Sequence, residues 1–103
     1  TIARECMEEL GIDVEVGDML VMGQVGGNEQ RDDVLHILFE GELLAGIPEL
    51  QADETSAMEV LWMPIEQIAQ VIMYPNVGEN LLDLILTQQK GKYIGTIQQP
   101  WLA

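Results

Sequence analysis

Hydrophobic residues recur with a helical period at the start of the chain. Ile2, Cys6 and Leu10 are spaced by four residues, so they share one face of a helix over residues 1–10. Gly11 follows directly, and glycine takes the left-handed conformation in which helices end at little cost. The pattern therefore predicts an amphipathic helix that stops at Gly11, with Cys6 packed as a small hydrophobic residue rather than acting as a nucleophile.

A period of two replaces the helical period after Gly11. Residues 13–16 and 19–25 are predicted as strands on either side of a turn at Gly17-Asp18, and residues 26–33 as the polar connection of a hairpin. The clearest strand pattern covers residues 34–44. Leu35, Ile37, Phe39 and Leu43 point one way along it, and His36, Leu38, Glu40 and Glu42 point the other. We expect the second face to be the wetter one and its histidine to be half-buried without a catalytic role. The alternative is that His36 contacts a substrate, since its neighbours on that face include carboxylates.

Residues 45–71 are predicted to contain a loop, a strand and a helix. The loop over residues 45–57 is rich in Gly, Pro, Asp and Glu, and an apolar run over residues 58–63 follows it. We expect that run to be a short strand in which Trp62 packs in the core. Pro64 is suited to the first turn of a helix that ends near Val71.

The last third of the chain predicts an apolar helix and a final strand. Tyr74-Pro75 marks a break, and Asn76 is a plausible N-cap for the helix that follows it and ends between residues 88 and 91. That helix is apolar almost all round, so it should be deeply packed or at an interface. A short strand is expected over residues 92–97, and Trp101 lies either against the body of the protein or on a dimer surface. Helices and strands together predict an α/β fold.

Composition limits the classes of function. The chain of 103 residues is long enough for one small domain over residues 1–103, and 48% hydrophobic residues supply a core. Eighteen acidic and four basic residues give a formal net charge of −14. This charge argues against binding to polymeric nucleic acids, which needs clustered Lys and Arg, and against binding to anionic membrane surfaces.

Two further features suggest a cytoplasmic protein. Cys6 is the one cysteine, so it has no partner for an internal disulfide, as is usual in a reducing compartment. No apolar run reaches the roughly 18–20 residues that span a bilayer, and no signal peptide is visible.

The first helix also carries an unusual set of charges. Glu5, Glu8 and Glu9 are spaced i, i+3 and i+4, so all three lie on one helical face, and Arg4 is placed to pair with Glu8. Like charges on one face repel one another, and a divalent cation would relieve that repulsion. Clustered carboxylate oxygens are the ligands that Mg²⁺ and Mn²⁺ prefer.

The stretch from Arg4 to Ile12 resembles the Nudix hydrolases. It reads R-E-U-x-E-E-x-G-U, where U is apolar, and this is the C-terminal part of that family's signature. The glycine and glutamate of the earlier part would fall before Thr1, so we expect the chain to be N-terminally incomplete. The segment Glu59 to Pro64 is similar to the family's layout of Glu-x-x-Trp-x-Pro before a helix. The resemblance implies an α/β/α sandwich around a mixed sheet.

The resemblance also implies a reaction. Nudix hydrolases split a pyrophosphate bond in a nucleoside diphosphate linked to another group, using Mg²⁺ or Mn²⁺, so a small nucleotide-type substrate is expected. By this resemblance Glu5, Glu8 and Glu9 would hold the metal, with Glu8 and Glu9 as the strongest ligands. Arg4 would orient the glutamates through ion pairing.

The general base is left open between two carboxylates. Glu54 lies in the acidic loop and Glu59 precedes Trp62, and we prefer Glu59 slightly. Either residue could instead be a solvated surface carboxylate.

Two other classes of function remain open from the sequence. One is a catalytically silent Nudix-like domain that binds or regulates. The other is an acidic interaction module that forms a homodimer through the apolar helix over residues 77–86.

Overall fold

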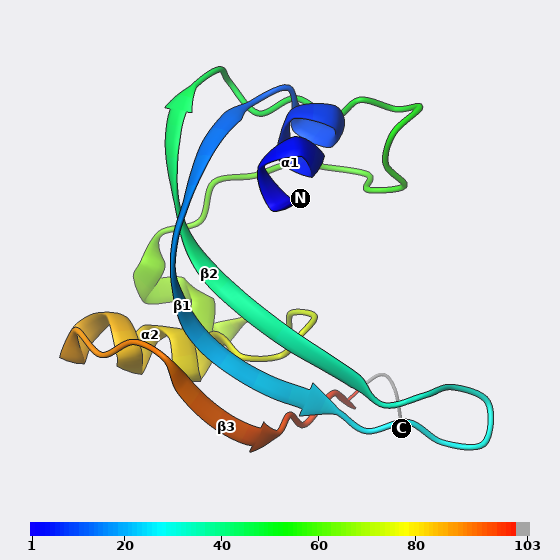
Figure 1. Ribbon diagram of the computed structural model, residues 1–103, viewed down its shortest axis with the longest axis vertical. Helices are drawn as coiled ribbons and strands as arrows, with labels where there is room; N and C mark the ends of the chain where they lie inside the picture. Colours follow the sequence, from blue (N-terminus) through cyan, green and yellow to red (C-terminus); the bar gives the residue numbers. More distant parts are fainter. Residues whose placement is uncertain (101–103) are drawn as a thin grey trace. The chain divides into compact units, whose positions relative to one another are not determined.

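The computed structural model describes residues 1–100 and has an α/β architecture, as predicted (Figure 1). The elements are α1 (Ile2–Leu10), β1 (Asp13–Val25), β2 (Val34–Ala45), the 3-10 helix η1 (Ile65–Gln70), α2 (Gly78–Thr87) and β3 (Lys92–Thr96). The chain divides into two compact units, which we describe in turn. The first unit comprises Thr1–Gly17 and Glu40–Trp62, and the second comprises Asp18–Phe39 and Met63–Ala103. Trp101 lies outside the described residues, and the prediction of a single domain over residues 1–103 stays a prediction.

The three strands form one mixed sheet in the order β2-β1-β3. β1 and β2 run in opposite directions on either side of the loop over residues 26–33 (Figure 1). β3 runs parallel to the later part of β1: Val21 lies opposite Lys92, and the register shifts after Met22 so that Gly23 lies opposite Gly95.

β1 is one continuous strand, so the predicted turn at Gly17-Asp18 is wrong. The glycine serves a close approach within the sheet instead of a turn. A Cβ atom at Gly17 would lie 2.8 Å from Cγ of Glu40 on β2, so any side chain there would clash with that of Glu40.

The second unit has a small apolar core. Val25, Val77 and Ile97 are buried in it, and Leu38, Leu81 and Ile94 pack against them. Residues of all three strands and of the start of α2 therefore meet at one place. The backbone of β1 also approaches closely here, since a Cβ atom at Gly23 would lie 2.8 Å from Cγ1 of Ile94.

The burial of β2 is the reverse of the prediction. His36, Leu38 and Glu40 are partly buried, whereas Leu35, Ile37 and Phe39 are 55%, 44% and 41% exposed. Segments from the C-terminal part of the chain cover the polar-looking face: Leu38 contacts the core cluster, and the ring of Tyr74 meets His36 edge-on at 5.1 Å. His36 is half-buried, as expected.

The break before α2 is held by a set of hydrogen bonds around Asn76. Its backbone N–H donates to Oε1 of Gln99 at 2.8 Å, and its side-chain amide donates to the carbonyl of Gln98 at 3.1 Å. The buried Gln99 donates in turn to the carbonyl of Met73 at 2.7 Å. The side chain of Asn76 is thus used for this contact and does not cap α2, whose N-cap residue is Val77; the predicted cap is wrong. The Tyr74–Pro75 peptide bond is cis.

α2 is packed on one side only. Gly78 approaches η1 so closely that a Cβ atom would clash with the carbonyl of Ile68, and Leu84 is 1% exposed. Leu86, in contrast, is 72% exposed, so the helix is not buried all round. It ends where predicted, at Gln88, which adopts a left-handed conformation with φ of 56°.

The strand expected over residues 58–63 is absent from the described part of the chain, where no strand of the three-stranded sheet pairs with this segment. Trp62 is 74% exposed, so its expected core position is also wrong. Pro64 precedes η1 as its N-cap residue rather than occupying its first turn. None of the helices within residues 1–100 combines the length and the apolar character needed to cross a bilayer.

Candidate active site

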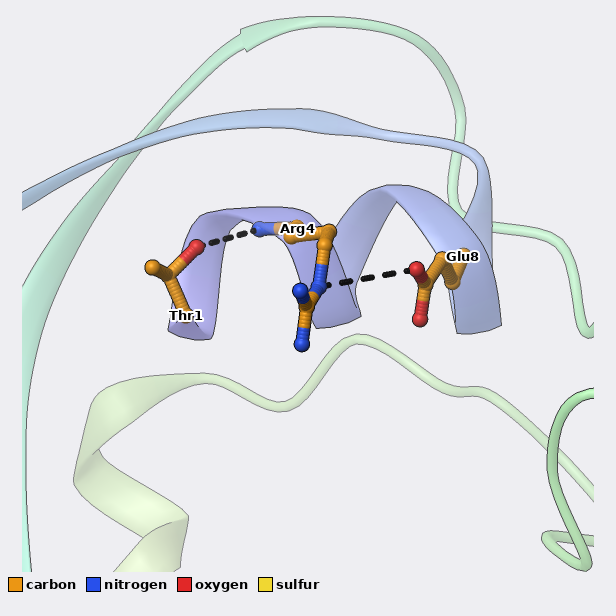
Figure 2. A network of polar contacts seen from close by, with 3 residues as sticks. All are labelled: Thr1, Arg4 and Glu8. Carbon is orange, nitrogen blue, oxygen red and sulfur yellow. Dashed lines mark hydrogen bonds and ion pairs between the residues drawn. The ribbon is translucent and has the colours of Figure 1, made fainter.

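Both ends of α1 are fixed by local interactions that the sequence predicts only in part. The hydroxyl of Thr1 accepts a hydrogen bond from the backbone N–H of Arg4 at 3.2 Å and so caps the first turn (Figure 2). At the other end Gly11 has φ of 68°, and its N–H donates to the carbonyl of Met7 at 3.0 Å. The predicted glycine stop is therefore confirmed.

Arg4 and Glu8 form the predicted ion pair. Nε of Arg4 lies 3.6 Å from Oε1 of Glu8, one helical turn along (Figure 2). The two side chains are 68% and 49% exposed, and pairs of this kind contribute only about 0.3–0.5 kcal/mol. The contact orients Glu8 but does not hold it strongly, so this carboxylate can be released to another partner at little cost.

The loop that follows β2 is hydrogen-bonded to the C-terminal end of α1. The N–H of Glu49 donates to the carbonyl of Leu10 at 3.0 Å, and the N–H of Gln51 donates to that of Glu9 at 2.9 Å. These carbonyls have no partner within the helix, so the loop satisfies them. The carbonyl of Gln51 accepts in turn from the N–H groups of Glu54 and Thr55, which folds the loop back on itself.

A pocket of about 510 Å³ lies between α1 and this loop, wholly within the first unit. From α1 it is lined by Ile2, Glu5, Cys6, Glu9 and Leu10. From the loop it is lined by Leu50, Thr55, Ala57, Glu59, Val60 and Leu61. The volume is in the range of about 300–1,000 Å³ that small-molecule sites occupy.

The pocket brings together some of the site residues that the sequence suggests. Glu5 and Glu9 line it from consecutive turns of α1, and Glu59 lines it from the loop. Glu8 and Arg4 are not among the lining residues. Glu54, the other candidate for the general base, is not among them either.

The fit of these residues to a divalent cation is partial. Their carboxylate oxygens are the right donors for Mg²⁺ or Mn²⁺. Within residues 1–100, however, no group of three or more His, Cys, Asp or Glu side chains is arranged to hold a metal ion. Glu8 contacts Arg4, which leaves Glu5 and Glu9 as the α1 carboxylates facing the pocket. A three-carboxylate site on α1 would require Glu8 to leave Arg4.

Most of the residues that line the pocket could not be predicted from the sequence. Cys6 is half-buried with a free thiol and lines the pocket as a small hydrophobic residue, close to expectation. The positions of Leu50 and Thr55 in the pocket could not be predicted. Nothing in the composition of residues 45–57 indicates which of these residues contact α1. The hydrogen bonds that Glu49 and Gln51 donate to the last carbonyls of α1 reveal that contact.

Comparison with known proteins gives one finding. The family model described as the NUDIX domain matches residues 1–90 of the 103-residue chain. No curated protein and no solved structure gives a significant match. The matched range includes α1, the loop after β2 and every residue that lines the pocket.

Proposed function

The chain belongs to the Nudix family, since the family model covers residues 1–90, and from this premise we propose that it hydrolyses a pyrophosphate bond in a nucleoside diphosphate linked to another group. The observation that supports this most is that Glu5 and Glu9 of the signature stretch line one pocket together with Glu59. The substrate is a small nucleotide-type molecule. The net charge of −14 argues against a polymeric nucleic acid, and the single free cysteine is in keeping with action in the cytoplasm.

In this proposal the carboxylates of α1 bind the metal ion. Glu9 and Glu8 are the main ligands and Glu5 the third, and the exposed contact with Arg4 releases Glu8 at little cost. A bound Mg²⁺ or Mn²⁺ supplies positive charge that neutralises phosphate oxygens and acidifies a water molecule. Arg4 is a positioning residue that orients Glu8 when no cation is present.

Glu59 is proposed as the general base. It lines the pocket together with Glu5 and Glu9, whereas Glu54 does not. In the reaction the oxygen of a water molecule attacks phosphorus while Glu59 accepts the proton of that water. The new P–O bond forms as the bridging P–O bond breaks, and its electron pair leaves with the departing phosphate group.

The proposal is tested by incubating the protein with a panel of nucleoside diphosphate derivatives. We expect release of a nucleoside monophosphate in Mg²⁺ or Mn²⁺ and none in excess chelator. Absence of hydrolysis across the panel, together with absence of divalent-ion binding in calorimetry, would overturn the proposal.

A second candidate is a catalytically silent domain that binds the same ligands. The observation in its favour is that Glu8 contacts Arg4 and that the described residues contain no three-donor metal group. Such a domain would show a ligand-dependent rise in melting temperature without any turnover.

Homodimer formation through α2 also stays a prediction. Ile85 and Leu86 are 41% and 72% exposed, so α2 has apolar residues available for a partner. Light scattering would decide this, and a monomer at all concentrations would contradict it.

A further inference from the structure

We propose that the pocket between α1 and the loop after β2 receives the group linked to the nucleoside diphosphate, and that this group is uncharged and apolar. The inference rests on the proposed function and names the class of leaving group. It starts from the lining of the pocket, which is apolar apart from three carboxylates, one hydroxyl and the thiol of Cys6.

The apolar part of the lining comes from both walls. Its members are Ile2, Leu10, Leu50, Ala57, Val60 and Leu61. An apolar group that enters the pocket removes its own surface and that of these side chains from water, which favours binding in proportion to the area buried.

The charged part of the lining is entirely acidic. Glu5, Glu9 and Glu59 line the pocket, and no Lys or Arg is among the described residues around it. A leaving group with its own carboxylate or phosphate would meet like charges without a compensating cation from the protein. The acidic lining therefore disfavours anionic groups, and the apolar side chains around it favour an uncharged group.

The loop wall is fixed before any ligand arrives. Glu49 and Gln51 donate backbone hydrogen bonds to the last carbonyls of α1, and Thr55 donates to the carbonyl of Gln51. The hydroxyl of Thr55 also accepts from the N–H of Ala57 at 3.2 Å. A preorganised wall loses little entropy on binding, so the preference for apolar groups is a property of the folded protein.

The proposed metal and base residues share the pocket with the apolar lining. The proposed metal ligands Glu5 and Glu9 and the proposed base Glu59 line the same pocket as the apolar residues. A cation bound by these carboxylates would supply positive charge for a diphosphate, and the group linked to that diphosphate would then be within reach of the apolar residues of the same pocket.

A pair of ligands that differ by one charge tests the inference. The probes are ADP esterified on its terminal phosphate with a benzyl group, and ADP esterified with a 4-carboxybenzyl group. Affinity is measured by calorimetry in Mg²⁺, and hydrolysis is followed in parallel. We expect the benzyl ester to bind at least about tenfold more tightly.

Two variants with the same substitution show where the preference arises. Leu61→Lys places a cation in the lining at a residue that is 60% exposed, so the substitution should be tolerated by the fold. It should abolish or reverse the preference for the benzyl ester. Leu35→Lys is the matched control, because Leu35 is 55% exposed and does not line the pocket. It should behave like the wild-type protein.

The outcomes separate this inference from the proposed function. Equal or tighter binding of the 4-carboxybenzyl ester, no binding of either ester, or an unchanged preference in Leu61→Lys would each overturn the inference. Hydrolysis without any preference contradicts the inference and leaves the proposed function standing. A preference without hydrolysis supports the inference and contradicts the proposed function.

Discussion

Glu8 and Glu9 are adjacent in the sequence but have different surroundings. Glu9 is half-buried and lines the pocket, and its carbonyl accepts a hydrogen bond from Gln51. Glu8 is half-exposed and contacts Arg4 at 3.6 Å. Successive residues of a helix point about 100° apart, so two neighbouring carboxylates share a ligand only if one side chain extends around the helix. The long and weakly held side chain of Glu8 is able to do this.

The two candidates for the general base are distinguished by one pair of substitutions. Glu59→Gln removes the carboxylate that lines the pocket, and we expect kcat to fall by about 10²–10⁴. Glu54→Gln should leave kcat close to the wild-type value, because Glu54 does not line the pocket. The assignment is wrong if the two variants lose activity equally.

Gly23 and Gly26 provide a matched test of packing in the second unit. A Cβ atom at Gly23 would lie 2.8 Å from Ile94 and 2.9 Å from Ile97, whereas one at Gly26 would meet nothing within 4 Å. Gly23→Ala should therefore lower the free energy of unfolding by about 1–3 kcal/mol. Gly26→Ala should change it by less than about 0.5 kcal/mol. Urea denaturation measures both, and equal stabilities would contradict the close approach of β1 to β3.

Elements whose signal is local could be predicted from the sequence. The period of α1 with its glycine stop, the alternation along β2 and the apolar run of α2 each depend on residues close in the chain, and all three elements form. The predictions that were wrong concern features that depend on residues distant in the chain. Gly17 lies within a strand, beside Glu40 of the neighbouring strand. The side chain of Asn76 forms hydrogen bonds with Met73 and Gln98 and does not cap α2.

The two faces of α2 give a prediction at the scale of an element. Leu84 is 1% exposed and Leu86 is 72% exposed, although they are two residues apart on the same helix. Leu84→Ala should cost about 2–5 kcal/mol of stability by leaving a cavity. Leu86→Ala should cost less than about 0.5 kcal/mol, since leucine and alanine have similar helix propensity. A large loss for Leu86→Ala in thermal or urea unfolding would show that this face is covered in solution.

For the molecule as a whole, acidic residues far outnumber basic ones. The chain has 4 basic residues against 18 acidic ones. Arg4 pairs with Glu8, and Lys90 pairs with Asp18 at 3.0 Å. In the proposed function a diphosphate would bring further negative charge to the acidic lining of the pocket, and a bound divalent ion would neutralise it.

The candidate site shows how far sequence reasoning reaches. The shared face of Glu5 and Glu9 follows from helical spacing alone. Glu59 lines the same pocket although it lies about fifty positions further along the chain. Its candidacy follows from the family resemblance and not from any periodicity. The apolar wall that completes the pocket depends on how the loop after β2 folds against α1, which no local pattern encodes.

The central claim is that the carboxylates of α1 support metal-dependent hydrolysis. The most direct measurement is turnover against Mg²⁺ concentration for Glu8→Gln, with Glu66→Gln as the control because Glu66 is an exposed carboxylate on η1. The fold should survive the change at Glu8, since its pair with Arg4 is exposed. We predict that Glu8→Gln lowers kcat by at least about 10²-fold and that Glu66→Gln leaves it unchanged. Near-normal turnover in Glu8→Gln would show that Glu8 serves only as a partner of Arg4 and would contradict the account.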